Sequence, residues 1–243
     1  MTEKEKNLQA MVDSGIVAIV RANTSEGLLN VVEAIEKGGV KAIEVTMTTP
    51  KAIETIAAVT DKYKGDVLVG VGTVLDAETA RLAILAGAKF VVTPIMNPEV
   101  IRMAKKYSRI VVCGAFTPTE IVAAWEHGSD IVKIFPTSSV GPEYIKDLKG
   151  PFPQISMLPT GGVTVENTGA FLKAGACAVA VGNQARRQNR TLIHRLEDDA
   201  TTPGGPRRRV EVPFNCGPRE ALHEFVRACL RRRRRPACVP RRA

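Results

Sequence analysis

The chain has 243 residues, which fits one large domain or one domain with an appendage, since domains average roughly 150 residues. Hydrophobic residues make up 44% and charged residues 24% of the sequence, a balance that supports a packed core and excludes bulk disorder. No run approaches the ~18 consecutive apolar residues that a membrane-spanning helix needs.

The amino-terminal segment and the cysteines both bear on the cellular compartment. Residues 1–7 carry charges of both signs and no apolar stretch, so they do not resemble a secretory signal. The five cysteines form neither a Cys-x-x-Cys pair nor the Cys/His spacing of a metal site, and their odd number suits reduced thiols. We therefore expect a cytoplasmic protein with no membrane contact and no metal site.

The net charge of +9 is concentrated at the carboxyl end of the chain. Residues 1–184 hold 14 Lys, 4 Arg and 19 acidic residues, whereas residues 185–243 hold 16 Arg, no Lys and 6 acidic residues. The preference for lysine over arginine thus reverses at one point. We predict two regions, a folded domain over residues 1–184 and an Arg-rich tail over residues 185–243.

Within the first region, short β-branched runs alternate with amphipathic segments. Each run is predicted as a strand: Ile16–Val20, Ala42–Thr46, Val67–Val71, Phe90–Val92, Ile110–Cys113, Ile131–Phe135, Ile155–Leu158 and Cys177–Val181. Helical patterns include Gly27–Lys37, Ala77–Ala86, Pro98–Lys106, Pro118–Glu126 and Val165–Lys173. Eight βα units predict parallel strands in an α/β fold, a (β/α)8 TIM barrel, with a doubly wound open sheet as the competing architecture. A short opening helix, Glu3–Met11, is expected to close the bottom of the barrel.

The polar residues favour the barrel over the open sheet. A barrel carries its chemistry at the carboxyl ends of its strands. Polar, glycine or proline residues lie within or shortly after seven of the eight predicted strands: Arg21, Glu44, Thr73, Pro94, Lys133, Thr160, Gly161, Gly162, Gly182 and Asn183. These positions would form one rim.

Lys133 lies in the run Asp-Ile-Val-Lys-Ile-Phe-Pro. Because side chains alternate along a strand, Ile131, Lys133 and Phe135 share one face. If that face is inward, burial disfavours the charged ammonium and leaves an amine that can attack a ketone and form a Schiff base. The alternative is a lysine that extends from the strand end into water and has no chemical role.

Glu44 changes the balance between these two interpretations. Ala42, Glu44 and Thr46 share one face of the second predicted strand. A carboxylate that faces the same interior as Lys133 can act as a general acid/base. It can equally serve as a structural ion-pair partner, since two buried opposite charges are costly unless they are paired or functional.

Two glycine-bearing turns follow the last two predicted strands, at Pro159–Gly162 and Val181–Asn183. Many barrels bind phosphate there through backbone N–H groups and a helix N-terminus. Glycine allows such a close approach, although turns of this kind are also simply tight connections. The segment Gly70–Val74 is not a dinucleotide-binding loop, because it lacks the third glycine and the spacing.

Seven stretches of the sequence carry a family resemblance when taken together. They are Gly15–Arg21, Ala42–Thr49, Val69–Val74, Val92–Pro94, Ile131–Pro136, Gly150–Pro153 and Leu158–Gly162. With them, residues 15–183 resemble the 2-keto-3-deoxy-6-phosphogluconate / 4-hydroxy-2-oxoglutarate aldolases, the short class I pyruvate aldolases. The resemblance implies a (β/α)8 barrel, a homotrimer, and reversible cleavage of a 2-keto-4-hydroxy acid to pyruvate and an aldehyde without metal or other cofactor.

The resemblance also implies a substrate and site residues. The substrate would be 2-keto-3-deoxy-6-phosphogluconate, which yields glyceraldehyde 3-phosphate, and/or 4-hydroxy-2-oxoglutarate, which yields glyoxylate. Lys133 matches the Schiff-base lysine and Glu44 the acid/base. The substrate positions are Thr73, Pro94 and Phe135 around the pyruvate moiety, Arg21 at a basic contact, and Thr160, Gly161, Gly162, Gly182 and Asn183 at the phosphate turns. Thr48 stands where some members have arginine, and Asn183 stands where a serine often contacts phosphate.

The resemblance stops after Gln184, where the family continues with a Leu-Val pair and a last helix. This chain instead runs Ala-Arg-Arg-Gln-Asn-Arg. The switch to arginine, three new cysteines and Pro/Arg runs favour translation in a shifted reading frame, so the eighth helix is not recognisable and the tail is expected to be largely disordered. Residues 220–232 carry an apolar stripe at helical spacing that could partly replace the missing helix. The alternative is a genuine basic tail that binds nucleic acid or acidic surfaces, but the tail has only two aromatic residues.

Two other functions stay open on the sequence. A phosphosugar isomerase or epimerase barrel shares the phosphate turns but needs no lysine imine. A barrel disabled by its altered carboxyl end would retain Lys133 and Glu44 without activity, because a site needs a closed barrel to position them.

Overall fold

The structure is a computed structural model that describes residues 1–21, 31–33, 35–36, 38–63, 65 and 67–182. Asn183, the tail over residues 185–243 and most of the predicted helix Gly27–Lys37 lie outside the described residues, although residues 31–33 and 35–36 are helical.

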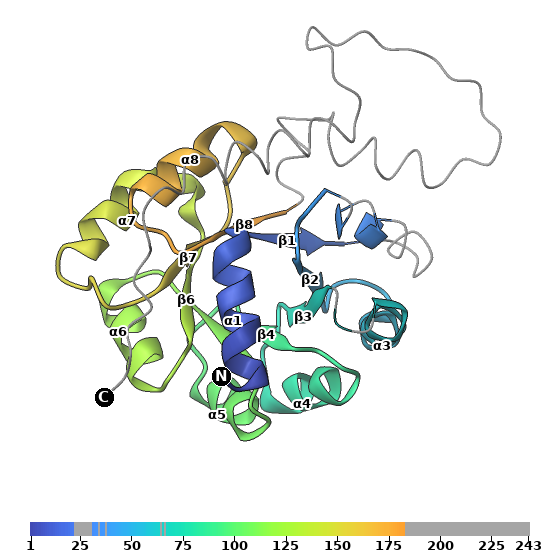
Figure 1. Ribbon diagram of the computed structural model, residues 1–243. Coiled ribbons are helices and arrows are strands. Elements are labelled where there is room, and N and C mark those ends of the chain that lie inside the picture. The colour runs from blue at the N-terminus through green and yellow to red at the C-terminus, as the bar shows by residue number, and fades with distance from the viewer. Residues whose placement is uncertain (22–30, 34, 37, 64, 66, 183–243) are drawn as a thin grey trace, which may run out of the picture.

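Eight parallel strands form a nearly closed barrel, as the sequence predicts (Figure 1). The strands are β1 (Ile16–Val20), β2 (Ala42–Thr46), β3 (Leu68–Gly72), β4 (Phe90–Val92), β5 (Ile110–Ala115), β6 (Ile131–Ile134), β7 (Met157–Pro159) and β8 (Val179–Val181). Strands β1 to β7 pair in parallel in sequence order, and β8 returns to pair with β1. The remaining seam, between β7 and β8, is joined by a bridge from Thr160 to Ala180 and by a 3.0 Å bond from the Cys177 N–H to the Met157 carbonyl.

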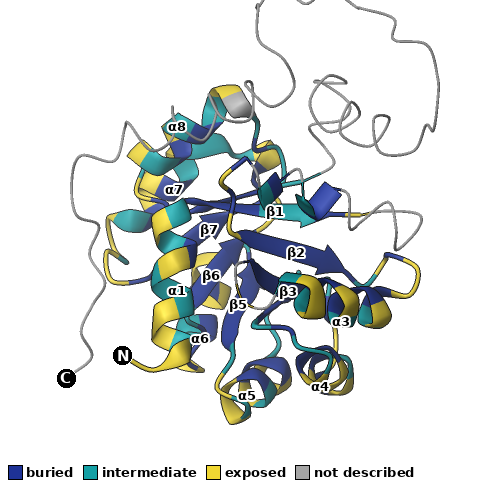
Figure 2. Cartoon of the chain, turned by 45° about the vertical axis from the view of Figure 1, so that its right-hand side comes forward, coloured by how far each residue is buried: buried dark blue, intermediate teal, exposed yellow. Residues whose placement is uncertain are grey.

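Helices surround this sheet and cover its outer face. They are α3 (Ala52–Tyr63), α4 (Ala77–Leu85), α5 (Pro98–Lys106), α6 (Pro118–Glu126), α7 (Gly141–Lys149) and α8 (Val165–Lys173), with a short 3-10 turn, η1 (Thr137–Ser139), after β6. Figure 2 shows buried strands at the centre and helices that turn an exposed face outward. In the described part of the chain, no helix is long and apolar enough to cross a membrane.

Local sequence explains where several of these helices begin. The Thr117 side chain accepts the backbone N–H of Glu120, whose carboxylate in turn accepts the Thr117 N–H. This reciprocal capping box satisfies two backbone donors at the start of α6, and Pro118 suits the first helical position. At the start of α5, the Asn97 side chain accepts from the N–H groups of Glu99 and Val100, without a reciprocal bond.

The barrel interior is lined by alternate residues of the strands. This inner cluster consists of Met11, Val17, Ala42, Leu68, Phe90, Val92, Ile110, Val112, Ile131, Leu158, Ala178 and Ala180. The intervening strand residues, such as Ile43, Val45, Val132 and Ile134, belong to a separate cluster between the strands and the helices. This alternation is the period of two expected of strands, and it defines which polar side chains point inward.

Helix α1 (Glu3–Ser14) lies across the amino-terminal end of the barrel (Figure 1). Met11 is fully buried within the inner cluster, and Leu8 and Val12 pack against it. The helix runs three residues beyond the predicted Met11 and ends where Gly15 adopts a left-handed φ of 71°. The expectation that this segment closes the bottom of the barrel is confirmed.

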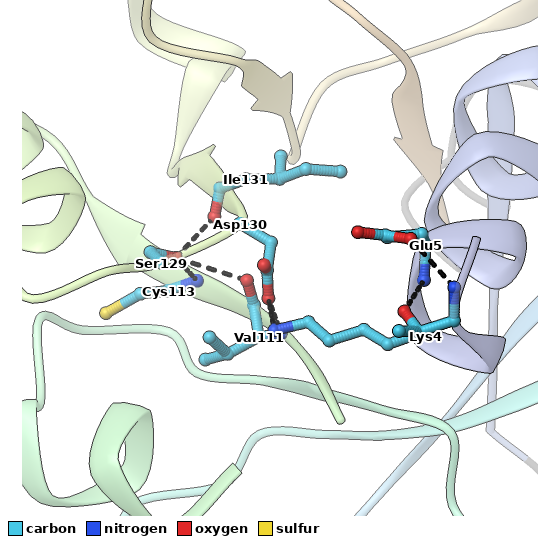
Figure 3. A network of polar contacts seen from close by, with 8 residues as sticks. Lys4, Glu5, Val111, Cys113, Ser129, Asp130 and Ile131 are labelled. Atoms are coloured by element: carbon cyan, nitrogen blue, oxygen red, sulfur yellow. Dashed lines mark hydrogen bonds and ion pairs between the residues drawn. The ribbon is translucent and has the colours of Figure 1, made fainter. Parts of the chain in front are cut away.

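A polar network joins α1 to the start of β6, as Figure 3 shows. The Lys4 ammonium lies 2.9 Å from the Asp130 carboxylate, which accepts the Val111 N–H at 2.9 Å. The neighbouring Ser129 hydroxyl accepts the Cys113 N–H at 3.0 Å and donates to the Ile131 carbonyl at 2.6 Å. These contacts fix the approach of β6 to β5 just before Lys133.

Candidate active site

Lys133 points into the barrel from β6. Its register neighbours are Gly114 on β5 and Leu158 on β7. The side chain is only 5% exposed, while Val132 and Ile134 on either side belong to the outer cluster. No hydrogen bond or ion pair to its Nζ occurs among the described residues, and its closest described ring is that of Phe135, 5.2 Å from Nζ to the centroid. A buried amine without a polar partner is available for chemistry, whereas the surface-lysine alternative is wrong.

Glu44 points into the same interior from β2. It is 2% exposed and alternates with Ile43 and Val45, which face the helices. Burial raises the pKa of the Glu44 carboxyl group, and the positive charges of Lys133 and Arg21 partly oppose that rise. The described residues contain no direct ion pair between Glu44 and Lys133, so the lysine acts on the carboxyl group at a distance.

Gly72, at the end of β3, makes room for the Glu44 side chain. A Cβ atom placed on Gly72 would overlap the carboxylate of Glu44 and lie 2.6 Å from its Cγ. The next residue, Thr73, has a left-handed φ of 59°, which is uncommon for a residue other than glycine and often marks a functional site. Sequence reasoning missed Gly72, although the alternation of glycine and valine in Leu68–Gly72 indicates a strand face with space above it.

Gly114 performs a similar role on the other side of Lys133. A Cβ atom on Gly114 would lie 2.6 Å from the carbonyl oxygens of Thr93 and Pro94. The Thr93 hydroxyl also accepts the Gly114 N–H at 2.9 Å. The turn that contains Pro94, one of the predicted pocket residues, is therefore held directly against the strand position beside Lys133.

Phe135 connects Lys133 to the glycine turn after β7. Its ring is 37% exposed and would lie 3.4 Å from a Cβ atom on Gly161. Gly161 and Gly162 have φ values of 86° and 76°, and a Cβ on Gly162 would lie 2.6 Å from the Ser138 Cα. Both conformation and space therefore require glycine at position 162.

The same turn presents backbone donors. The Thr137 hydroxyl donates to the carbonyls of Thr160 and Gly161, at 3.2 and 2.7 Å, which fixes the turn with its carbonyls engaged. Within the described part of the chain, no hydrogen bond from the Gly162 N–H to a protein acceptor is found. Thr164 then caps the start of α8. Free N–H groups beside a helix N-terminus are suited to bind an anion.

The other predicted positions are located as follows. Arg21 directly follows β1 and is exposed, and its positive charge partly opposes the rise that burial causes in the pKa of the Glu44 carboxyl group. Gly182 follows β8 and is half-buried, and a Cβ there would lie 3.1 Å from that of Ile19. Thr160 is 4% exposed and pairs with Ala180 across the seam. The structure thus brings Lys133 and Arg21 each within electrostatic range of Glu44.

The groups present suit covalent acid/base chemistry at a ketone. A buried amine can form an imine, and a buried carboxyl group with a raised pKa can both give and take protons. Among the described residues, no group of three or more His, Cys, Asp and Glu side chains could hold a metal ion.

Comparisons with known proteins agree with this chemistry. Residues 8–196 match the family model of the KDPG and KHG aldolases, named for 2-keto-3-deoxy-6-phosphogluconate (KDPG) and 4-hydroxy-2-oxoglutarate (KHG). A 2-dehydro-3-deoxy-6-phosphogalactonate aldolase of Escherichia coli is 36% identical over 178 residues, which is 73% of this chain and 87% of that protein. A 2-dehydro-3-deoxy-phosphogluconate aldolase of Pseudomonas aeruginosa is 34% identical, over 66% of this chain and 73% of that protein.

The fold is also that of a solved aldolase. The KDPG aldolase of Legionella pneumophila, crystallised with pyruvate captured at low pH as a covalent carbinolamine intermediate, has a TM-score of 0.69 and is 25% identical. The match covers 81% of this chain and 98% of that structure. The chain belongs to the KDPG and KHG aldolase family, and it is a class I aldolase, a carbon–carbon lyase.

Proposed function

We propose that this chain cleaves a 2-keto-3-deoxy-6-phospho sugar acid to pyruvate and glyceraldehyde 3-phosphate through an imine on Lys133. The observation that carries the proposal is the burial of Lys133 and Glu44 in one barrel interior without a direct ion pair. Two such groups left apart are costly unless they serve a reaction. The covalent carbinolamine of the Legionella enzyme supports the same chemistry.

In the first step, the neutral amine of Lys133 attacks the C2 ketone of the substrate. The carbinolamine loses water and becomes a protonated imine, which draws electrons from the neighbouring carbons. The partly exposed ring of Phe135 lies over the nitrogen and covers it from solvent on one side.

In the second step, Glu44 moves the protons. Its carboxylate takes the proton of the C4 hydroxyl, and the C3–C4 bond breaks. The electron pair of that bond forms an enamine between C3 and the imine carbon, and the aldehyde departs. Protonated Glu44 then returns the proton to C3, and water hydrolyses the imine to release pyruvate and the free amine. A raised pKa suits a carboxyl group that must hold and release a proton in turn.

The glycine turn supports a phosphorylated substrate. The Gly162 N–H, which has no acceptor among the described residues, lies beside the start of α8, a favourable place for a phosphate. Arg21 at the rim is the cation that would face the substrate carboxylate, and Thr73 and Pro94 would border the pyruvate moiety. The relatives act on sugar acids that differ at C4, one a galactonate and the other a gluconate derivative. We propose the phosphorylated six-carbon acids as the substrate class, ahead of 4-hydroxy-2-oxoglutarate.

One experiment tests the imine. Reduction with borohydride in the presence of pyruvate should add the mass of reduced pyruvate to the peptide that contains Lys133. Lys133→Ala should abolish both the adduct and cleavage, and Lys133→Arg should do the same because a guanidinium stays protonated. An adduct on another lysine, or cleavage by Lys133→Ala, would overturn the proposal. The isomerase or epimerase alternative predicts no adduct, and no observation favours it.

A second experiment tests the substrate class. Cleavage rates of 2-keto-3-deoxy-6-phosphogluconate, its galactonate epimer and 4-hydroxy-2-oxoglutarate should be compared, with pyruvate release as the common signal. We expect kcat/KM to be highest for a phosphorylated acid and to fall for that substrate with added inorganic phosphate. A higher kcat/KM for 4-hydroxy-2-oxoglutarate would refute the phosphate preference.

We also propose that the chain works as a homotrimer. Among the described residues, four of the large apolar side chains that are more than half exposed lie on α4, just before it or on the loop after β4: Leu75, Leu82, Leu85 and Ile95. Apolar surface of this kind is usual at subunit contacts. Sedimentation analysis should give three times the mass of one chain, and Leu85→Glu should shift the equilibrium toward smaller species.

A further inference from the structure

We propose that Gly72 is a positioning residue that sets the place of the Glu44 carboxylate in the aldolase reaction. The proposal rests on the proposed role of Glu44 as the acid/base. It starts from one contact: the three atoms that would lie nearest to a Cβ on Gly72 are Oε1, Cδ and Cγ of Glu44. The outer half of the glutamate side chain therefore lies across the bare face of this glycine.

Backbone conformation does not explain the glycine. Gly72 is absent from the described glycines that have a positive φ. It is an ordinary strand residue, paired in register with Thr46 of β2, and its carbonyl accepts the Met47 N–H at 2.9 Å. Any residue could adopt this backbone, so the requirement for glycine comes from the space that Glu44 occupies.

The contact decides where the carboxyl group can lie. Glu44 is at the third position of β2, paired with Gly70, whereas its side chain reaches forward to the level of Gly72, next to the left-handed Thr73. This direction carries the carboxyl group toward the carboxyl ends of the strands, where a barrel binds its substrate. A methyl group at position 72 would push the carboxylate out of this place, and misplacement by about 1 Å can cost on the order of 10²-fold in rate.

The test is Gly72→Ala, read out step by step. We expect kcat for cleavage, and exchange of the pyruvate methyl protons with deuterium oxide, to fall by about 10²-fold. Borohydride trapping of pyruvate on Lys133 should persist, because the amine is untouched. The acid limb of the pH–rate profile should also shift, since the displaced carboxyl group leaves the environment that raises its pKa.

A matched control lies two residues earlier on the same face of the strand. A Cβ on Gly70 would overlap the ring of Phe90 rather than Glu44. Gly70→Ala should therefore lower the melting temperature while proton exchange, measured well below that temperature, stays near the parental rate. Equal losses of exchange in Gly70→Ala and Gly72→Ala would show a general packing effect and overturn the proposal.

A double mutant keeps the test decisive if Gly72→Ala folds poorly. The clash involves only the glutamate side chain, so in a Glu44→Ala background the Gly72→Ala change should cost little or no melting temperature. An equal loss of melting temperature in both backgrounds would contradict the inferred contact. The same exchange assay distinguishes a failure of the acid/base role from a failure of positioning. If Glu44 is not the acid/base, Glu44→Gln should exchange the pyruvate methyl protons at the parental rate. If only the positioning role is wrong, Glu44→Gln should exchange slowly while Gly72→Ala exchanges at the parental rate.

Discussion

The Nζ of Lys133 lies 5.2 Å from the centroid of the Phe135 ring, and the same ring lies against Gly161. One aromatic side chain therefore lies beside both the lysine proposed to form the imine and the turn proposed to bind phosphate. Because Phe135 directly follows β6 and is partly exposed, it forms the boundary between the buried amine and the entrance.

Replacing this ring should weaken the site without unfolding the barrel. Phe135→Leu retains apolar volume but removes the aromatic face beside the proposed protonated imine, and cation–π contacts are worth about 0.5–2 kcal/mol. We expect kcat/KM to fall by roughly two- to thirtyfold, with the melting temperature little changed. Phe152→Leu is the matched control, because Phe152 packs on the outer cluster away from the site. Similar losses of kcat/KM in the two variants would contradict the role of the ring.

Glu44→Gln should separate imine formation from proton transfer. We expect pyruvate trapping on Lys133 to persist in part, while turnover falls by roughly 10²–10⁴-fold, the usual effect of losing an acid/base. The carboxylate is the form that takes the C4 hydroxyl proton, so the parental rate should decline as the pH falls through the raised pKa of Glu44. Steady-state kinetics across pH should show that this decline is missing in the variant. Parental turnover by Glu44→Gln would make the carboxyl group structural only.

The same substitution should also change stability in a pH-dependent way. The folded protein binds the Glu44 proton more tightly than the unfolded chain, because burial raises the pKa of the carboxyl group above its ordinary value of 4.5. The carboxyl group therefore lowers the free energy of unfolding as the pH rises from its ordinary pKa in the unfolded chain to its raised pKa in the folded protein. Below that window, parent and Glu44→Gln should be about equally stable, and above it the variant should be the more stable. Urea unfolding at several pH values measures the difference, and a constant difference across pH would contradict the prediction.

The sequence predicted the strands and the direction of their side chains well, because period-two alternation leaves a clear pattern in β-branched runs. The predicted bounds of β1, β2 and β4 match the structure, as do those of α5, α6 and α8. β7 and β8 begin two residues later than predicted, at Met157 and Val179. Ile155 and Ala178 are buried just before these strands, and the adjoining Ser156 and Cys177 still make backbone hydrogen bonds to neighbouring strands. Composition alone does not distinguish such flanking residues from the strand itself.

The site was less predictable than the fold. Lys133 and Glu44 stand out because a charge in an apolar strand is unusual. Gly72 and Gly114 do not, because a glycine carries no sign of which side chain occupies the space above it. Their contacts with Glu44 and with the Pro94 turn join different strands, and such contacts depend on three-dimensional register. Asn183 lies outside the described residues, so its predicted role stays a prediction.

Truncating the Met11 side chain, which packs into the amino-terminal end of the barrel, should reduce stability. Met11 is fully buried within the inner cluster, and truncation of a buried methionine to alanine typically costs about 2–5 kcal/mol. Met11→Ala should lower the urea midpoint accordingly, with little change in KM because α1 lies at the end away from the site. Lys6→Ala, on the exposed face of the same helix, should change stability by no more than about 0.5 kcal/mol. A loss of similar size from Lys6→Ala would point to helix propensity in place of core packing.

The last prediction concerns the effect of the Arg-rich tail on stability and soluble yield. In a (β/α)8 barrel, the helix that follows β8, which is not the helix labelled α8 here, covers the outward face of β8. In this chain that face presents Val179 and the half-buried Val181. If residues 185–243 are read in a shifted frame and supply no such helix, apolar surface stays in water at about 25 cal/mol per Å². Exposure of on the order of a few hundred Å² of apolar surface would remove several kcal/mol from the free energy of unfolding, which is comparable with the ~5–15 kcal/mol stability of a whole domain. It would also promote aggregation and weaken activity.

Replacing everything after Gln184 with a family-like carboxyl segment should therefore raise the melting temperature and the soluble yield together. Sequencing the gene across the codons for residues 182–190 should reveal an insertion or deletion. A full-length chain that is already soluble, cooperatively folded and fully active would show instead that the tail provides a working substitute for the eighth helix.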